Sequence, residues 1–342
     1  MPLTRLVSSL LTALAIAAPL AATAQEPTRI KFTLDWKIQG LHAPFYRALS
    51  KGYFKAENLD VVIDQGEGSA AAVARVLSGT YQAGFGDINA IIQMAGGKQA
   101  DAPVMVYMVY NRAPFVLLTK NSSPVKTLKD TEGRSIGSPA GSASVKLFPA
   151  LAKKAGVDEK KVSWVSVAPN LQEQLLIRGE FEAAAVFSAT SYMNLVAMHQ
   201  DPDKDFRWIF YNDHGLDLYS NGVLVSARLA KENPKAVGGL VRAFNRALVE
   251  CAVQQEACVD EVVRVEPLLN KDIERRRLAY VLKSLVLTPE AAEIGLGDIQ
   301  DTRMASAIGQ VAEAYGLART PAVGEVFNRS FLPPRAERTV AR

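Results

Sequence analysis

Short apolar strands alternate with amphipathic helices along most of this chain, and that alternation restricts the folds open to it. Segment 30–54 shows the unit: apolar and polar residues alternate over 30–34, a loop follows, and an amphipathic helix runs from about 42 to 51 and stops at Gly52. Repetition of such units places the strands side by side in a mainly parallel sheet with helices on its faces. The pattern therefore predicts an α/β fold.

The strand pattern falls into two series, which predicts two lobes. The strands expected in the first series are 30–34, 59–64, 81–85 and 104–109. Those expected in the second series are 115–119, 135–138, 162–167, 183–187 and 208–211. The C-terminal third has a nearly all-helical pattern. We place one lobe at 28–111 plus 220–333 and the other at 112–219, so the chain crosses between them twice.

The composition is that of a globular protein with a substantial core. Hydrophobic residues make up 49% of the 342 residues, charged residues make up 22%, and the formal net charge is +4. No block of Lys and Arg and no array of basic and aromatic residues stands out, which argues against a nucleic-acid-binding surface. Residues 334–342 are polar and basic, and we expect them to form a loosely ordered tail.

The N-terminus carries the pattern of a secretory signal peptide. Arg5 supplies a positive charge, residues 6–18 are apolar, and 22–24 provide the small residues of a cleavage site before Gln25. The apolar run is shorter than a membrane span requires, and no cysteine stands at the cleavage site to carry a lipid. We therefore expect residues 1–24 to be removed from an exported protein.

Cys251 and Cys258 are the only cysteines. Export makes a disulfide chemically permissible. On one continuous helix the two residues would lie about 10 Å apart, too far to bridge, so a bond requires a helix break, which 254–256 could provide. Two separate buried thiols are the alternative, and both interpretations stay open. The spacing, with no histidine nearby, is not typical of a metal site.

The loop after the first strand holds the first candidates for a ligand-binding site. In open α/β sheets ligands bind at the carboxyl ends of the strands, where Trp36, Gln39 and His42 lie. Trp36 offers a stacking face and an N–H donor. His42 can donate or accept a hydrogen bond, or become charged near neutral pH. A purely structural histidine at a helix start is the alternative.

Two turns expose backbone N–H groups at helix N-termini. Gly68 and Ser69 follow the second strand, while Gly141 and Ser142 follow the strand that ends at Ser138. Helix N-termini of this kind bind anionic or polar groups, so two of them facing one cleft would form a clamp. An ordinary capped helix is the alternative for each.

Further candidates share a position at a strand end or at a crossing between the lobes: Asp87, Tyr110, Asn170, Phe187, Asp217 and Tyr219. Asp87 could pair with an amine or cap the helix that follows it. Tyr110 could form one wall of the cleft or pack in the core. Asn170 and Phe187 could close the cleft, and the last two residues could line it or act at the hinge.

The chain resembles the periplasmic solute-binding proteins of ABC importers, and within them the nitrate/sulfonate/taurine and thiamine-precursor (pyrimidine-binding) group. The residues that carry the resemblance are Leu34-Asp35-Trp36 with His42, Ala48 with Lys51-Gly52-Tyr53-Phe54, Leu59-Asp60-Val61, Phe85-Gly86-Asp87-Ile88-Asn89-Ala90, and Leu128-Lys129-Asp130 with Gly133, Arg134 and Gly137. Their order and spacing cover almost the whole chain beyond the signal peptide. Ile38 and Gln39 depart from the Pro-Asn usual in pyrimidine binders, and Pro44 replaces a usual Gly.

The resemblance implies a two-lobed periplasmic-binding-protein fold, type II like, with a hinged cleft that closes on its ligand. It implies a periplasmic, monomeric protein without a cofactor. The ligand would be a small nitrogen- or sulfur-containing organic solute, pyrimidine/thiamine-precursor-like or sulfonate-like, which is delivered to a membrane permease.

Three other functions are alternatives to this one. Residues 66–71 match G-x-G-x-x-A, and Asp87 has a tolerable spacing for a dinucleotide-dependent oxidoreductase. That pattern follows the second strand, however, and exported proteins rarely use nicotinamide cofactors. Fungal pyrimidine synthases share the fold but use a cysteine-rich motif and a self-sacrificing histidine, and this chain has no cysteine before Cys251. A receptor for a signalling partner is the third. We predict a transport receptor rather than an enzyme.

Overall fold

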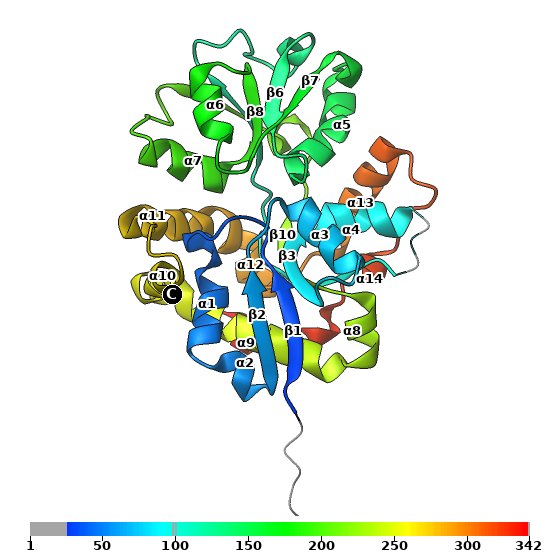
Figure 1. Cartoon of the computed structure of the whole chain (residues 1–342). Helices are drawn as coiled ribbons and strands as arrows, with labels where there is room; N and C mark the ends of the chain where they lie inside the picture. The colour runs from blue at the N-terminus through cyan, green and yellow to red at the C-terminus, as the bar shows by residue number, and fades with distance from the viewer. Residues whose placement is uncertain (1–25, 98, 100, 341–342) are drawn as a thin grey trace, which may run out of the picture.

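Two lobes lie one above the other in the protein (Figure 1), and the computed structural model describes residues 26–97, 99 and 101–340. Each lobe contains one five-stranded sheet. The strands of lobe 1, in spatial order, are β2 (Leu59–Asp64), β1 (Thr28–Thr33), β3 (Ala83–Asp87), β10 (Asn221–Val225) and β4 (Val104–Met108). Those of lobe 2 are β7 (Ser163–Ser166), β6 (Ser135–Ser138), β8 (Ala183–Phe187), β5 (Phe115–Lys120) and β9 (Phe206–Phe210). The predicted signal peptide lies outside the described residues.

One strand in each sheet runs against its neighbours. β10 is antiparallel to β3 and β4, and β5 is antiparallel to β8 and β9, whereas β1–β2, β1–β3, β6–β7 and β6–β8 are parallel pairs. Each reversed strand is the one by which the chain enters a lobe from the other lobe, so it starts at the cleft where the others end. The expected α/β fold with mainly parallel sheets is confirmed, each sheet being mixed.

Helices cover both faces of each sheet. Those between the strands of lobe 1 are α1 (Ala43–Ser50), α2 (Tyr53–Ala56), α3 (Ser69–Leu77) and α4 (Ile88–Gly96). Those of lobe 2 are α5 (Ala143–Ala155), α6 (Gln172–Arg178) and α7 (Ser188–Ala197). A short 3-10 turn, η1 (Gly40–His42), precedes α1. Pro44 at the start of α1 favours a helix there, because its fixed φ suits the first turn and its missing N–H has no helical partner to lose.

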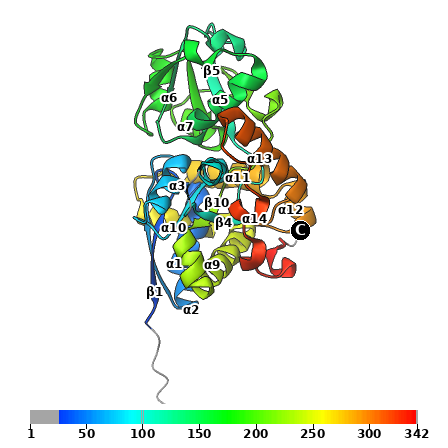
Figure 2. The same ribbon diagram turned by 90° about the vertical axis from the view of Figure 1, so that its right-hand side faces the viewer.

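The C-terminal third wraps around lobe 1. Its elements are α8 (Ala227–Glu232), α9 (Pro234–Val253), α10 (Gln255–Val265), α11 (Lys271–Val281), η5 (Leu282–Val286), α12 (Pro289–Ile294), α13 (Asp301–Tyr315) and α14 (Val323–Val326). The apolar side of α9 packs on α1, where Phe244 stacks on Phe45 with ring centroids 4.5 Å apart. Figure 2 shows α13 along the side of the molecule, where it reaches α5 of lobe 2. None of the described helices combines the length and apolarity needed to span a bilayer.

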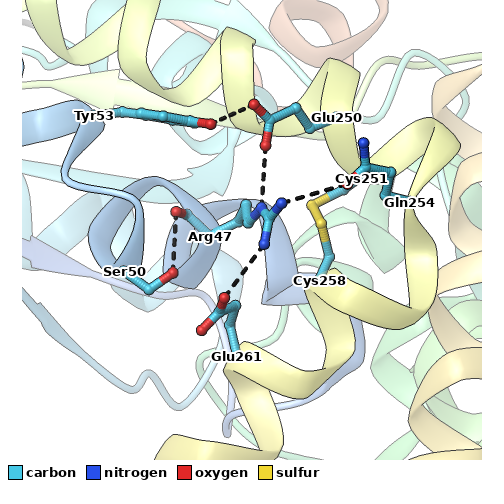
Figure 3. Close-up of a disulfide and its surroundings, with 8 residues drawn as sticks. All are labelled: Arg47, Ser50, Tyr53, Glu250, Cys251, Gln254, Cys258 and Glu261. Carbon is cyan, nitrogen blue, oxygen red and sulfur yellow. Dashed lines mark hydrogen bonds and ion pairs between the residues drawn. A yellow bond between two sulfur atoms is a disulfide. The ribbon is translucent and has the colours of Figure 1, made fainter.

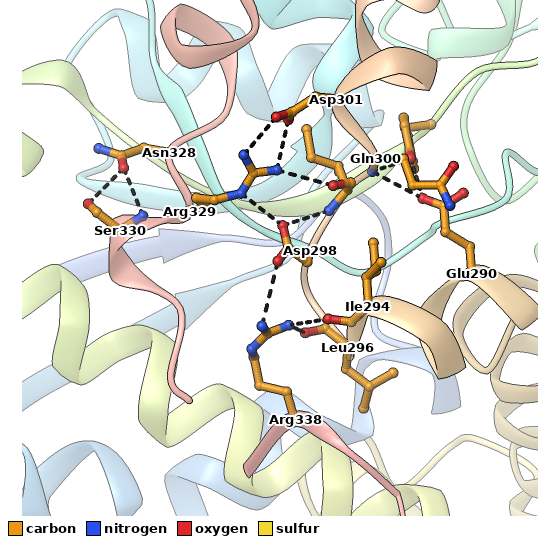
Figure 4. A network of polar contacts seen from close by, with 12 residues as sticks. Glu290, Ile294, Leu296, Asp298, Gln300, Asp301, Asn328, Arg329, Ser330 and Arg338 are labelled. Atoms are coloured by element: carbon orange, nitrogen blue, oxygen red, sulfur yellow. Dashed lines mark hydrogen bonds and ion pairs between the residues drawn. The ribbon is translucent and has the colours of Figure 1, made fainter. Parts of the chain in front are cut away.

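The end of the chain is packed on lobe 1, which corrects the expected loose tail over 334–342 as far as residue 340. Arg338 is buried, and its guanidinium donates to the carbonyls of Pro333 and Leu296 at 2.8 and 2.7 Å. It also lies 3.5 Å from a carboxylate oxygen of Asp298. Asp298 in turn accepts from Arg329 in the network of Figure 4. Polar composition predicted a solvated tail, but the buried arginine binds two backbone carbonyls and holds the segment on lobe 1.

A disulfide joins Cys251 and Cys258 across the break between α9 and α10 (Figure 3). The first helix ends at Val253 and the second begins at Gln255, which brings the two Cα atoms to 5.6 Å. The bonded alternative is therefore the one that the structure contains. Beside it, Arg47 of α1 donates to Glu250 and lies 3.4 Å from Glu261, so one buried guanidinium joins α1 to both helices.

Candidate functional site

A cavity lies between the two lobes, at the carboxyl ends of the strands. The cavity is narrow, with a volume of about 20 Å³. Lobe 1 contributes Asp35, Trp36 and Ser69, and lobe 2 contributes Ser142, Gln172, Val186, Phe187 and Thr190. Every one of these residues stands at the end of a strand or in the loop and helix start that follow it. The cavity therefore lies where the open-sheet rule expects a ligand to bind.

Asp35 is held in place by two buried donors. Its Oδ1 lies 2.7 Å from Nε2 of His42, and its Oδ2 accepts the side-chain amide of Asn221 at 2.7 Å. Nδ1 of His42 accepts the backbone N–H of Gln39 at 3.2 Å, so Nε2 carries the proton and donates to Asp35. Both nitrogens of the fully buried ring are thus engaged inside lobe 1. His42 fixes the loop and does not line the cavity.

The two helix N-termini meet each other instead of forming an anion clamp. The N–H of Ala71 in α3 donates to the carbonyl of Gly141 in lobe 2 at 3.3 Å. Gly68 has a φ of +147°, and a Cβ there would lie 2.1 Å from the same carbonyl oxygen. Only glycine allows this close approach. The contact brings the lobes together and occupies one of the N–H groups that an anion would need.

Several buried polar atoms at the cavity have no partner among the described residues. Oγ of Ser69 and Oε1 of Gln172 are two of these, and both residues line the cavity. The side-chain N–H of Gln172 donates to Glu173, which also accepts from Ser191 at 2.5 Å, while Oε2 of Glu173 is left unpaired. An unpaired buried polar group costs about 1–3 kcal/mol. A bound ligand that supplied the missing hydrogen bonds would recover that free energy.

Aromatic rings reach the cavity from both lobes. Trp36 comes from the loop after β1, and Phe187 is the last residue of β8. Phe187 is supported from behind by Phe115, with ring centroids 5.4 Å apart. Among the described lining residues Asp35 is the one with a charged side chain. The lining thus combines two aromatic rings with neutral polar side chains and one carboxylate. Such a lining suits a flat molecule that carries hydrogen-bond donors.

The structure brings four of the predicted ligand residues to the cavity and two to the contact between the lobes. Trp36, Ser69, Ser142 and Phe187 line the cavity, and Gly68 and Gly141 form the contact beside it. The loops at the strand ends therefore supply these residues of the cavity. The sequence did not indicate which side chains would face inward.

Several other candidates point into the protein. Gln39 is buried, and its Oε1 has no partner in the part of the chain that the structure describes; Ser138 donates to the carbonyl of Ala185 at 2.7 Å within the sheet. Tyr110 is buried against Phe85, with ring centroids 5.3 Å apart, and its hydroxyl has no partner in that part of the chain either. Burial raises its pKa well above the usual value, so it is a neutral phenol.

Asp87 and Asn170 also lie outside the cavity lining. Asp87 is buried at the start of α4 and accepts from the side chain of Asn89 at 2.9 Å. Burial raises the pKa of its carboxyl to about 7. Asn170 is exposed on the loop before α6. Neither meets the residues around Trp36 that line the cavity.

Asp217 and Tyr219 belong to the hinge. Arg303 of α13 donates to Asp217 at 2.8 Å and lies over the ring of Tyr219, 4.1 Å from its centroid. The hydroxyl of Tyr219 donates to Glu290, which also pairs with Arg303 at 2.9 Å. Arg303 further donates to the carbonyl of Asn111 at 2.9 Å on the other crossing. The C-terminal helices thus fix both crossings to lobe 1.

Asp35, Gln172, Val186 and Thr190 line the cavity without having been among the sequence candidates. For Asp35 the sequence provides the clearest indication of a lining position, because it precedes Trp36 at a strand end. Gln172 and Thr190 lie in the first turns of helices that follow strands, which is the same signal that selected Ser69. The alanine-rich strand before Val186 gave no such indication.

Comparison with known proteins places this geometry in a family. Residues 39–257 match the family model described as "NMT1/THI5 like". The chain belongs to the NMT1/THI5-like family. One relative is the riboflavin-binding protein RibY of Chloroflexus aurantiacus. It is 26% identical over an alignment of 352 residues, which covers 93% of this chain and 91% of RibY. Another is the 4-amino-5-hydroxymethyl-2-methylpyrimidine phosphate synthase of Aspergillus parasiticus, 25% identical over 75% of this chain and 78% of the synthase.

Solved structures share the fold of this family member. The alkanesulfonate-binding protein SsuA of Xanthomonas axonopodis pv. citri, bound to MOPS, superposes with a TM-score of 0.66 at 15% identity, over 90% of this chain and all of SsuA. The periplasmic aliphatic sulphonate-binding protein SsuA of Escherichia coli gives a TM-score of 0.63 at 15% identity, over 86% and 95% of the two chains. The predicted resemblance and the periplasmic-binding-protein fold are confirmed.

Proposed function

We propose that this NMT1/THI5-like chain is the periplasmic substrate-binding component of an ABC importer, and that it captures a flat, nitrogen-containing heterocycle between its lobes. The observation that carries the proposal is the lining of the cavity. Trp36 and Phe187 offer aromatic faces from opposite lobes, and the side-chain oxygens of Ser69 and Gln172, which have no partner within residues 26–97, 99 and 101–340, could bond a ligand between them.

The charge of the lining separates the two ligand classes that the sequence left open. A sulfonate is an anion that is bound best by cationic side chains or free backbone N–H groups. The described lining holds the carboxylate of Asp35, and the N–H of Ala71 at the nearby helix start is bonded to Gly141. An amino-substituted or otherwise donor-bearing ring would instead meet acceptors at Asp35 and Gln172. One named relative is a riboflavin-binding protein and the other a pyrimidine phosphate synthase, and both compounds contain nitrogen heterocycles.

Import is supported by the fold and by the sequence pattern. Among the solved structures with this fold, one from Staphylococcus aureus is described as the ligand-binding component of an ABC-type import system, and two others are sulfonate-binding proteins. The predicted export signal would place the mature chain where such components meet their permease. Hinged lobes around one cavity provide the closed form that a permease would recognise.

A second candidate is a pyrimidine-synthase-like enzyme, which the identity to the Aspergillus parasiticus protein favours. Two observations weigh against it. No free cysteine occurs in the described part of the chain, because Cys251 and Cys258 are bonded to each other. Within the same part, no group of three or more His, Cys, Asp or Glu side chains is arranged to hold a metal ion.

Native mass spectrometry of the purified mature protein tests the proposal. We would add 4-amino-5-hydroxymethyl-2-methylpyrimidine, riboflavin and MOPS separately and record the mass of each complex. We expect a one-to-one complex with one of the heterocycles, with the compound recovered unchanged in mass on unfolding. A complex with MOPS alone would indicate a sulfonate receptor, and a chemically altered compound would indicate the enzyme.

A further inference from the structure

Arg277 of α11 reaches from lobe 1 into lobe 2. Its guanidinium donates to the carbonyls of Ala189 and Thr190 in the first turn of α7, at 3.3 and 2.7 Å, and to the side chain of Asn194 at 3.0 Å. The residue is 2% exposed although it lies between two lobes. In Figure 1, α7 lies directly above α11. Arg277 is therefore a buried cation that joins the two lobes.

The other side of the guanidinium is fixed within lobe 1. Glu274, one turn earlier on α11, accepts from Nε of Arg277 at 2.9 Å and from Nη2 at 3.3 Å. The same carboxylate accepts the backbone N–H of Gly40 at 2.5 Å. A Cβ at Gly40 would lie 2.3 Å from the carbonyl oxygen of Glu274, so glycine permits this close packing. Glu274 thus ties Arg277 to the loop that carries Trp36.

The carbonyls that Arg277 holds belong to the opposite wall of the cavity. Phe187 and Thr190 line the cavity, and α7 begins between them at Ser188. Next to Arg277, Tyr280 of α11 stacks on Tyr192 of α7 with ring centroids 5.6 Å apart. One chain of contacts therefore runs from the Trp36 loop, through Glu274 and Arg277, to the Phe187 wall.

Besides the backbone hydrogen bond between Ala71 and Gly141, an ion pair joins the lobes at α5 and α13, and this pair is exposed to solvent. Lys153 of α5 and Glu313 of α13 form an ion pair at 3.2 Å, with side chains 55% and 75% exposed. Exposed pairs of this type contribute little, because water screens them and the long side chains lose freedom. Arg277 is instead almost fully buried and makes five acceptor contacts among the described residues, so losing its lobe 2 partners would leave a buried charge poorly paired.

We propose that Arg277 is the latch of this binding protein: it closes the two lobes without help from a ligand and positions the α7 wall against the Trp36 loop. Its role in ligand capture rests on the function proposed above, whereas its role in closure does not. Opening the lobes would break all three donations to lobe 2 and leave the pair with Glu274 in place.

Distances between two spin labels test the latch without any ligand. We would place labels on Lys55→Cys in lobe 1 and Lys204→Cys in lobe 2, both exposed positions, and measure by pulsed electron paramagnetic resonance. The native cysteines are bonded to each other and do not take label. Arg277→Met is the test variant, and Lys153→Met, which removes the exposed interlobe pair, is the matched control.

We expect a short-distance population in the parent protein and in Lys153→Met, and its loss in Arg277→Met. Should Arg277→Met fail to fold, the double variant Glu274→Gln with Arg277→Met removes both buried charges and leaves none unpaired. Three results would overturn the latch. The parent protein could lack the short-distance population, Arg277→Met could keep that population, or Lys153→Met could lose it to the same extent as Arg277→Met. None of these outcomes depends on which compound binds, so the latch and the proposed function fail separately.

Discussion

Nε2 of His42 lies 2.7 Å from Oδ1 of Asp35, and this contact connects the buried interior of lobe 1 to the surface of the cavity. His42 is completely buried, whereas Asp35 lines the cavity beside Trp36. The second oxygen of Asp35 accepts from Asn221 on the strand that returns from lobe 2. The loop, the histidine and the second crossing therefore meet at one carboxylate.

Replacing Asp35 by Asn should destabilise the fold. An asparagine has one acceptor oxygen and one donor group, so its NH2 would face either the N–H of His42 or the amide of Asn221. A buried donor without an acceptor costs about 1–3 kcal/mol, which urea unfolding would detect as a lower midpoint. Asp60→Asn, at an exposed position on β2, is the control and should unfold like the parent. Equal midpoints for all three proteins would show that the carboxylate is not needed there.

Ser69→Ala should separate binding from stability. Its Oγ is buried and unpaired among the described residues, so its removal should leave the thermal midpoint unchanged or raise it. Loss of the ligand hydrogen bond should weaken binding by about 1–3 kcal/mol in a calorimetric titration. Ser144→Ala is the contrasting control, since that Oγ donates to the carbonyl of Val186 at 3.0 Å and its loss should lower the midpoint. A Ser69 variant with a lower midpoint and unaltered affinity would rule out this role.

Reduction of the disulfide should loosen the α9–α10 corner. Cys251 and Cys258 are separated by 7 positions in sequence, and closing so short a loop restricts the unfolded chain by about 2–3 kcal/mol on the chain-entropy model. Urea unfolding with and without reductant measures this difference. The double variant Cys251→Ser with Cys258→Ser should have the unfolding midpoint of the reduced protein, and reductant should not change that midpoint. If reductant shifts the double variant equally, the effect does not come from this bond.

Asp87 should make stability depend on pH. Burial raises the pKa of its carboxyl from 3.8 to about 7, so the folded state holds its proton more tightly than the unfolded state does. Its contribution is therefore most favourable below about pH 4 and is lost as the pH rises to about 7. Relative to the parent, Asp87→Asn should gain a few kcal/mol of stability between pH 5 and 8, at about 1.4 kcal/mol per pKa unit. Parallel midpoint-against-pH curves for the two proteins would contradict the assignment.

Local patterns predicted the strands and most helices because the apolar spacing of each element lies within that element. The ranges Ser135–Ser138 and Ala183–Phe187 were predicted to the residue. The side-chain positions that the sequence did not predict depend on partners far away in the chain. Asp217 bonds to Arg303, which is 86 positions later, and Arg277 bonds to Ala189, 88 positions earlier. A strand end shows where a site can be, whereas the choice between cavity, hinge and latch is made by those distant side chains.

Binding of a flat heterocycle on Trp36 between the lobes is tested by a calorimetric titration of the mature protein. We would titrate 4-amino-5-hydroxymethyl-2-methylpyrimidine, riboflavin and MOPS into the parent protein, into Trp36→Ala, and into Trp164→Ala, a half-exposed tryptophan on β7 away from the cavity. The account predicts one-to-one binding of a heterocycle that Trp36→Ala weakens at least tenfold, about 1.4 kcal/mol, and that the control preserves. Binding of MOPS alone, or heterocycle binding that is the same in all three proteins, would contradict it.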